Sequence, residues 1–269
     1  MKSPGERIVD ELYATAKYGS LSEGTLKRAA EYGLRREKKE KGALKAAKAK
    51  LHQIYGAYLG EGSLERAAVL VRGLPDLVDE EIFPDVCRRL MSCHASSAER
   101  LSFIEELYAR IFSGFSGPLK VLDLCCGFHP LGVPWMPLAA GSEYLACDTD
   151  SRMVELLSVV FKRARSGPRF SAQACDVADL PAPLPADLVF LLKTLPSLER
   201  QERGLGRKVL DRLRAPRVVA SFPAQSLSGR EKGMRQNYEQ LWSPVFRELG
   251  FLIEIMEYPT ETFYLLNRS

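Results

Sequence analysis

Short apolar runs alternate with helical stretches throughout the second half of this chain of 269 residues. The apolar runs fall at residues 120–125, 143–148, 169–176, 186–193 and 217–223, and helical periodicity fills residues 151–165, 198–213 and 236–249. Apolar runs of about four to eight residues are typical of buried strands. Their regular alternation with helices predicts a parallel, doubly wound α/β sheet.

The last two strands break this alternation. Residues 251–259 (FLIEIMEYP) and 262–268 (TFYLLNR) are too close for a crossover helix, so they must pair as an antiparallel hairpin. The expected sheet then has seven strands. A βα sheet closed by such a hairpin resembles the Rossmann-like, class I S-adenosylmethionine-dependent methyltransferase fold, whereas a nicotinamide-binding Rossmann domain ends on a parallel strand.

The first half of the chain has helical periodicity and no strand-like alternation. Ser22 and Ser63 are expected to begin helices, and Gly42 to interrupt the pattern between them. Residues 73–92 predict a connection with one short helix, and the sequence SSAE at 96–99 predicts a capping box that begins a helix ending by Gly114. These boundaries predict a helical domain over residues 1–92 and a methyltransferase domain over residues 93–269.

The composition is that of a globular protein, with 46% apolar residues, enough for a sizeable core in one or two domains. No uninterrupted apolar run approaches the ~18 residues of a membrane span. The segment MKSPGERIVDELY carries charges where a signal peptide has its apolar region. We therefore expect a cytoplasmic protein without membrane contact, and no obligate protein partner is implied.

The net charge of +4 conceals one strongly basic segment. Residues 27–50 hold ten Lys or Arg and three Glu, an excess of seven positive charges, so the rest of the chain has a net charge of −3. The basic side chains expected along one helical stripe, or next to it, are Arg35, Lys38, Lys41, Lys45 and Lys48. A solvated helix face is the plain alternative. Acidic partners are scarce here, however, as expected where RNA phosphates supply the negative charge.

The stretch KVLDLCCGFHP at 120–130 joins an apolar strand to an abrupt turn at Gly127. It lacks most glycines of a dinucleotide fingerprint. A sulfonium cofactor has no pyrophosphate to wrap, so one glycine can suffice, and the pattern favours S-adenosylmethionine over NAD. Acidic residues also end three consecutive strands, at Asp123, Asp148 and Asp176. By analogy with the methyltransferase fold, we expect Asp148 at the ribose and Asp176 at the adenine amino group.

The cysteines do not form a metal-binding pattern. Cys125 and Cys126 are adjacent, so along a strand they point to opposite faces, and the chain contains no C-x-x-C pair. No metal site is therefore expected, and the six cysteines are interpreted mainly as small buried side chains.

Four stretches together resemble the aminoglycoside-resistance 16S ribosomal RNA methyltransferases, which modify N7 of a decoding-site guanine. They are HASSAERLSFIEELYARIF (94–112), VLDLCCGFHPLGV (121–133), LVFLLKTLPSLER (188–200) and VVASFPAQSLSGREKGMRQNY (218–238). The likeness covers nearly the whole chain, including the basic helical region. It implies methyl transfer from S-adenosylmethionine, with S-adenosylhomocysteine as product, to 16S rRNA in the assembled 30S subunit, where the methyl group blocks aminoglycoside binding.

The resemblance also implies roles for individual residues. The cofactor would be bound by Arg100, Asp123, Gly127, Asp148, Asp176, Val177 and Leu192. The guanine would enter beside Lys193, Ser221, Phe222 and Arg230, the residues assigned to catalysis. The rRNA would be contacted by Arg35, Lys38, Lys41, Lys45 and Lys48, and by Lys232, Met234 and Arg235. Cys175 departs from the glutamine expected before Asp176, which affects the adenine contact.

The chemistry of N7 methylation sets few demands on the side chains. N7 of guanine has a lone pair and no proton at neutral pH, so no general base is needed, and His94 and His129 are interpreted as structural. Phe222 is suited to stack on a flipped base, with a core position at the strand end as the alternative. The rival functions are a methyltransferase acting on tRNA or a small molecule, a non-catalytic RNA-binding protein with a degenerate methyltransferase fold, and an NAD oxidoreductase.

Overall fold

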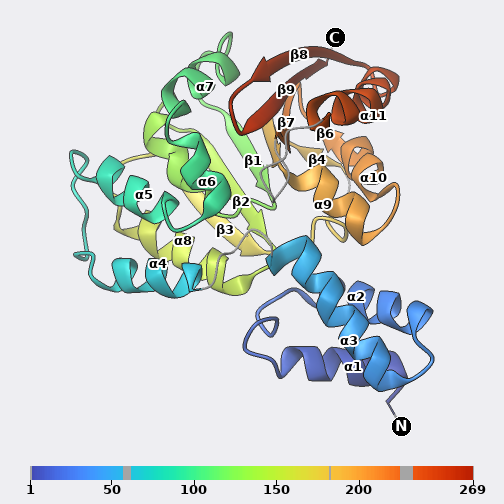
Figure 1. Ribbon diagram of the computed structural model, residues 1–269. Helices are drawn as coiled ribbons and strands as arrows, with labels where there is room; N and C mark the ends of the chain where they lie inside the picture. Colours follow the sequence, from blue (N-terminus) through green and yellow to red (C-terminus); the bar gives the residue numbers. More distant parts are fainter. Residues whose placement is uncertain (1, 57–61, 182, 225–232, 269) are drawn as a thin grey trace.

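A seven-stranded sheet forms the centre of the molecule (Figure 1). The structure is a computed structural model that describes residues 2–56, 62–181, 183–224 and 233–268. The strands of this sheet are β1 (Lys120–Leu124), β2 (Glu143–Asp148), β3 (Arg169–Ala174), β5 (Leu188–Leu192), β7 (Arg217–Pro223), β8 (Phe251–Glu257) and β9 (Glu261–Arg268). Two short strands, β4 (Leu184–Pro185) and β6 (Leu213–Arg214), pair separately.

The strand order is β3-β2-β1-β5-β7-β9-β8. The first five strands of that order are parallel to one another, and β9 lies antiparallel between β7 and β8. This arrangement confirms the predicted fold class, including the terminal hairpin. Asp176 lies two residues beyond β3, so the third strand is shorter than predicted.

Helices cover both faces of the sheet (Figure 1). One face packs on α4 (Ser63–Arg72), α5 (Phe83–Met91), α7 (Ile104–Ile111), α8 (Ser151–Arg163) and the 3₁₀ segment His129–Trp135. The other face packs on α9 (Thr194–Gln201), α10 (Leu205–Arg212) and α11 (Met234–Glu248). Neighbouring strand residues divide between the two cores, Val121 to one and Leu122 to the other, because side chains alternate across a strand. None of the helices in the described ranges is long and apolar enough to cross a membrane.

A third apolar core belongs to the N-terminal helices α1 (Pro4–Tyr13), α2 (Glu23–Arg36) and α3 (Glu40–Leu51), which continue into a π-helical turn at His52–Gly56. The predicted boundary at residue 92 does not match this division. Leu64, Phe83 and Leu90 are buried in the sheet's own core, so α4 and α5 belong to it. Sequence periodicity marks the apolar face of a helix but not the neighbour that buries it.

Three helical predictions differ from the structure in their boundaries. Gly42 lies inside α3, and the interruption falls at residues 37–39. The helix expected from Ser96 is two helices, α6 (Ala95–Arg100) and α7, and α6 begins after His94 without the side-chain hydrogen bond of a capping box. The helix predicted over 198–213 is likewise divided into α9 and α10, at Gly204, whose φ of 83° favours glycine.

The two helices of the basic segment pack closely because α2 carries a glycine at their contact. A Cβ atom at Gly33 would lie 2.2 Å from the main-chain oxygen of Ala43 in α3. A main-chain atom cannot move aside without displacing its helix. A Cβ atom at Gly42, by contrast, would meet the side chain of Glu37, at 3.0 Å from its Oε2, and that side chain can rotate away.

We expect Gly33→Ala to destabilise the N-terminal helices by about 1–3 kcal/mol through overpacking. Gly42→Ala is the matched control and should be neutral or stabilising by up to ~1 kcal/mol, since alanine is favoured over glycine in a helix. Thermal denaturation followed by circular dichroism measures both. Equal effects of the two substitutions would contradict the role assigned to Gly33.

Candidate cofactor and substrate site

One pocket opens at the carboxyl ends of the parallel strands. Its wall contains Cys125, Cys126 and Gly127 after β1; Asp148 and Thr149 at the end of β2; Cys175, Asp176 and Val177 after β3; and Leu192, Lys193 and Thr194 after β5. Helix α6 adds Ser96 and Arg100, and the N-terminal helical unit adds Thr25, Ile54 and Tyr55. Parallel α/β sheets bind ligands at this edge. The pocket is therefore the candidate active site.

Two residues of the pocket wall have strained main chains. Cys125 and Lys193 have φ values of 54° and 55°, and they are the non-glycine residues with positive φ in the described ranges. Each follows the last residue of a central strand, β1 or β5. Such conformations cost about 1–3 kcal/mol, and they concentrate at functional sites.

Gly127 brings the turn after β1 close to the end of β2. Its N–H donates to Oδ2 of Asp148 at 2.9 Å, and a Cβ atom there would lie 3.2 Å from Cε1 of His94. With a φ of 51° as well, the position favours glycine. Two features therefore favour the single glycine of the sequence motif: its positive φ and its close contact with His94.

Asp148 is a buried carboxylate with acceptor capacity left over. Oδ2 accepts from Gly127 and Oδ1 accepts from the N–H of Asp150 at 3.1 Å. A carboxylate has about four acceptor sites, so two remain, which suits the two hydroxyls of a ribose. Burial raises the pKa of Asp148 to about 6, against the opposing effect of the two N–H donors.

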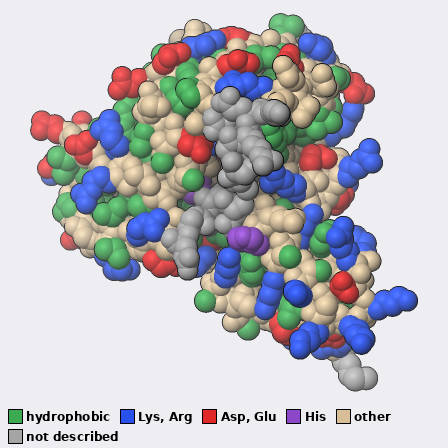
Figure 2. All heavy atoms as spheres, viewed as in Figure 1, with side chains coloured by type: hydrophobic (Ala, Val, Ile, Leu, Met, Phe, Trp, Pro, Cys, Tyr) green, Lys and Arg blue, Asp and Glu red, His purple; other side chains and the backbone are tan. Residues whose placement is uncertain are grey.

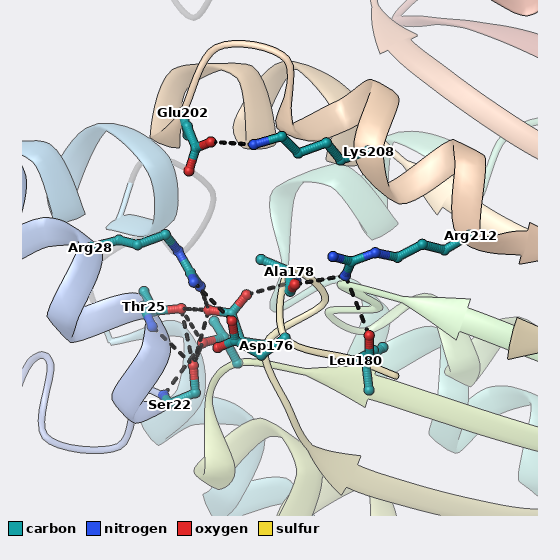
Figure 3. Close-up of polar contacts among 11 residues, drawn as sticks. Ser22, Thr25, Arg28, Asp176, Ala178, Leu180, Glu202, Lys208 and Arg212 are labelled. Atoms are coloured by element: carbon teal, nitrogen blue, oxygen red, sulfur yellow. Dashed lines mark hydrogen bonds and ion pairs between the residues drawn. The ribbon is translucent and has the colours of Figure 1, made fainter. Parts of the chain in front are cut away.

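Asp176 faces the same pocket from the turn after β3 (Figure 3). Its Oδ2 interacts with Ser22 at 3.3 Å and with Thr25 and Arg28, all from the N-terminal helical unit. Its Oδ1 accepts from the N–H of Ala178 at 2.9 Å. Val177 is buried beside it. The predicted adenine acceptor is therefore in the pocket wall and already has partners from α2.

Two basic residues of the pocket wall, Arg100 and Lys193, belong to a charged network around the buried Glu261. Arg100 donates to the two carboxylate oxygens of Glu261 at 2.9 and 2.8 Å, and the Oγ of Ser221 hydrogen bonds to the same group. Nζ of Lys193 lies 2.6 Å from Glu99 and 3.7 Å from Glu261. Burial favours the neutral form of Glu261, but the charges of Arg100 and Lys193 outweigh it and lower its pKa.

His94 lies beside this network without a charge of its own. Burial, with the nearby Arg100 and Lys193 charges, lowers its pKa to about 4. Its Nδ1 is 3.1 Å from the Oγ of Ser97. His94 is therefore neutral near pH 7 and packs against the Gly127 turn, consistent with the structural role expected for it.

Three of the described residues predicted to bind the cofactor or to act in catalysis are absent from the pocket wall. Asp123 is buried behind it, where its Oδ2 accepts from the hydroxyl of Tyr144 at 2.7 Å and contacts Nδ1 of His129 at 2.8 Å. Ser221 is fully buried under the Glu261 network. Asp123 is the next-to-last residue of β1 and its side chain is turned into the core, so its position near the strand end does not bring it to the pocket.

Phe222, which was predicted to stack on the guanine, is the third of these residues. Its ring lies in the core at the end of β7. Its ring stacks on Tyr238 with a centroid distance of 4.8 Å and meets Tyr264 edge-on at 5.3 Å. Phe222 is 1% exposed. The alternative considered for it, a core residue at the strand end, describes this position. Leu192 and Lys193, on the neighbouring strand end, do line the pocket.

The predicted RNA-binding residues occupy two regions. Arg35, Lys38, Lys41 and Lys45 are exposed and Lys48 is half-buried, and none forms an ion pair with another described residue. Lys and Arg side chains gather over this helical unit on the face shown in Figure 2. Arg235 instead ties α11 to the hairpin by donating to the carbonyl of Tyr258 at 2.7 Å. Met234 begins α11, and Arg230 and Lys232 lie outside the described residues.

Sequence reasoning missed Glu261, Glu99, Thr25 and Tyr55. Glu261 is one of three acidic residues in the hairpin, with Glu254 and Glu257, and the apolar strand that follows it is its only distinguishing signal. Thr25 and Tyr55 belong to the N-terminal helical unit, where the sequence pattern indicated RNA contacts and core packing. Within the described ranges, no group of His, Cys, Asp and Glu is arranged to hold a metal ion.

The sheet order, the glycine turn and the acidic strand ends define a class I S-adenosylmethionine-dependent methyltransferase. The chain belongs to the ribosomal RNA methyltransferase (FmrO) family, whose model matches residues 14–265. It is similar to the 16S rRNA (guanine(1405)-N(7))-methyltransferase of Micromonospora rosea, with 35% identity over 99% of both chains. The enzyme of the same name from Frankia casuarinae is 36% identical over 98% of this chain and 93% of its own.

A solved structure extends the likeness to three dimensions. The crystal structure of 16S rRNA methyltransferase RmtF in complex with S-adenosyl-L-homocysteine superimposes with a TM-score of 0.85 at 28% identity and covers the whole of both chains. The pocket described above fits such a cofactor, because Asp148 keeps free acceptor sites and Gly127 allows a close main-chain approach. The cofactor is therefore S-adenosylmethionine, as the sequence predicted.

We expect the affinity for S-adenosylhomocysteine to fall as the pH drops through about 6. The raised pKa of Asp148 means that its carboxylate, the form with acceptor sites for both hydroxyls of a ribose, is lost on acidification at that pH. Asp148→Asn should lose affinity by roughly 10–100-fold near pH 8 and flatten the profile between about pH 5 and 7. Isothermal titration calorimetry across this range measures both effects.

The exposed Asp211 of α10 supplies the control, since Asp211→Asn removes a carboxylate outside the pocket. The raised pKa of Asp148 also predicts how the free energy of unfolding depends on pH. Because burial favours the neutral form, the stability that protonated Asp148 contributes is present at low pH and lost as the pH rises through about 6, so Asp148→Asn should not destabilise the protein near pH 8. Wild-type affinity in Asp148→Asn would remove this residue from the cofactor site.

Proposed function

We propose that this protein transfers a methyl group from S-adenosylmethionine to N7 of the decoding-site guanine of 16S rRNA, within the assembled 30S subunit, and so blocks aminoglycoside binding there. The observation that carries the proposal is the pocket itself, with Lys193 and Arg100 balanced by Glu99 and Glu261 beside the two carboxylates Asp148 and Asp176. Its support beyond the site is the full-length similarity to 16S rRNA (guanine(1405)-N(7))-methyltransferases.

The reaction requires orientation more than acid–base chemistry. When bound, S-adenosylmethionine supplies an activated methyl group, and the positive charge of its sulfonium passes to the methylated base. No proton moves, since N7 carries none, and the neutral His94 fits a site without a general base. Lys193 presents a charge already balanced by Glu99 and Glu261, so the wall of the pocket does not repel a cationic 7-methylguanine.

The left-handed main chain of Lys193 fits a role in placing the guanine. A strained residue at a strand end is held there by its surroundings, here the hydrogen bond from its N–H to the Oγ of Ser221 at 2.9 Å. Arg100, fixed by two hydrogen bonds to Glu261, is assigned to the carboxylate of the cofactor. Ser221 and Glu261 thus support the residues that would contact the ligands.

The central test is transfer of a labelled methyl group to intact 30S subunits, naked 16S rRNA and bulk tRNA in parallel. We expect label on 30S subunits, located by cleavage at 7-methylguanine in the decoding site. Lys193→Ala should retain cofactor affinity within about threefold but lose turnover by at least ~100-fold, as expected for a group that acts on the reacting base. Label on tRNA alone, or on no RNA, would contradict the proposed substrate, and wild-type turnover in Lys193→Ala would remove it from the site.

The exposed lysines of α3 are assigned to rRNA phosphates, which would fix the position of the enzyme on the subunit without reading sequence. Two observations support this assignment. These lysines have no acidic partner among the described residues, and they are exposed on the same helix. The double substitution Lys41→Glu with Lys45→Glu should weaken binding to 30S subunits at least about tenfold and reduce its salt dependence. Filter binding at several salt concentrations measures both effects.

The control reverses two exposed charges elsewhere, with Arg89→Glu on α5 and Lys162→Glu on α8. This variant has the same net charge as the α3 variant, so nonspecific electrostatic effects are matched. Cofactor affinity should be unchanged in both. If the two double variants bind 30S subunits equally well, the α3 stripe has no special role; if the α3 variant also loses cofactor affinity, its defect is in folding.

A further inference from the structure

The turn that carries Asp176 is held from two sides (Figure 3). From the sheet side, Nη1 of Arg212 on α10 donates to the carbonyls of Ala178 at 2.8 Å and Leu180 at 3.3 Å. From the other side, α2 brings Thr25 and Arg28 to the carboxylate of Asp176. The turn therefore has its main chain fixed by the catalytic core and its functional side chain fixed by the N-terminal helical unit.

The donors around Asp176 are arranged unevenly. Oδ2 has three partners, Ser22, Thr25 and Arg28, whereas Oδ1 has the N–H of Ala178 as its partner among the described residues. Each carboxylate oxygen has about two acceptor sites, so Oδ1 keeps one for a ligand N–H. Arg28 forms an ion pair with this carboxylate in a buried position, where Asp176 has 5% of its side chain exposed.

The N-terminal unit is hydrogen-bonded to the ribose side of the pocket as well. The N–H of Ser22 donates to the carbonyl of Thr149 at 2.9 Å, and the N–H of Ser151 donates to the carbonyl of Ser20 at 2.9 Å. Tyr55 hydrogen bonds to the carboxylate of Asp150. The helical unit is thus joined to the segments that follow Asp148 and to the turn that holds Asp176, the two places assigned to the adenosine.

We propose that Thr25 and Arg28 are positioning residues of the cofactor site, which hold the carboxylate of Asp176 oriented toward the amino group of adenine. The N-terminal unit is then a component of the cofactor site as well as an RNA-docking surface. The inference rests on the assignment of Asp176 to adenine in the proposed function. It makes a specific claim about ligand selectivity, because an oriented carboxylate favours a 6-amino group and repels a 6-oxo group.

A contact that serves only to attach the N-terminal unit would predict a different result. Loss of such a contact would change stability, or lower affinity for all adenosine-like ligands alike. Loss of a positioning contact lets Asp176 rotate, which reduces both the attraction for an amino group and the repulsion of a carbonyl. The ratio of affinities for two ligands that differ at this position therefore separates the two roles.

The experiment measures dissociation constants of the full chain for S-adenosylhomocysteine and S-inosylhomocysteine by calorimetry. We expect the wild-type protein to prefer S-adenosylhomocysteine at least tenfold. In Thr25→Val and in Arg28→Met this preference should fall to threefold or less. Thr25→Ser keeps the hydroxyl and should keep the preference, and Lys27→Met, which removes a neighbouring exposed charge on α2, should behave as wild type.

Unchanged preference in both Thr25→Val and Arg28→Met, or equal loss of affinity for both ligands, would overturn the proposal. Melting temperatures close to that of the wild type identify the variants that have kept their fold, and Thr25→Val removes no volume that would open a cavity. A wild-type protein without preference would overturn the assignment of Asp176 to adenine and the proposal with it. No RNA is present in the assay, so a wrong rRNA target leaves its result unaffected.

Discussion

Buried carboxylates at one edge of the sheet are the constraint on which the rest of this structure depends. Asp148, Asp176 and Glu261 are each nearly or fully buried, and an unpaired charge in such a place costs several kcal/mol. Each has donors from a different part of the chain: the Gly127 turn, helix α2, and Arg100 with Lys193. The glycine turn, the docking of α2 and the position of α6 can all be understood as ways of supplying those donors.

The sequence predicts the arrangement of the strands well because each strand has its own local pattern. Apolar runs separated by helices gave the parallel sheet, and the short turn before TFYLLNR required an antiparallel hairpin. The sequence also predicts Gly127, Asp148 and Asp176 at this edge, since they lie at or just after strand ends that meet there; all three line the pocket, and their contacts with the cofactor stay predictions. Turns and strand ends can be predicted from a single sequence because each depends on residues that are close together in the chain.

The errors arise where a residue's role depends on a distant partner. Phe222 and Asp123 were predicted in the site for the same reason as Asp148, because they lie near the end of a strand. Their side chains instead pack in the core, where Phe222 contacts Tyr238 and Asp123 contacts Tyr144. Glu261 could not be recognised because its partner Arg100 is 161 positions away. The domain boundary was misplaced for the same reason, as α4 and α5 have amphipathic patterns that fit either core. Prediction failed at contacts between segments remote in sequence.

The place of Glu261 in the strand order has a consequence for how the protein is made. β9 lies between β7 and β8, so the strand that begins with Glu261 is inserted into the sheet after its neighbours have been synthesised. Contacts of such long sequence separation form late and slow the folding of a domain. Until residue 261 has been synthesised, Lys193 has Glu99 as an acidic partner, but Arg100 lacks the carboxylate that binds it in the folded protein. The pocket therefore acquires the carboxylate that binds Arg100 only when β9, the last strand of the sheet in the sequence, is in place.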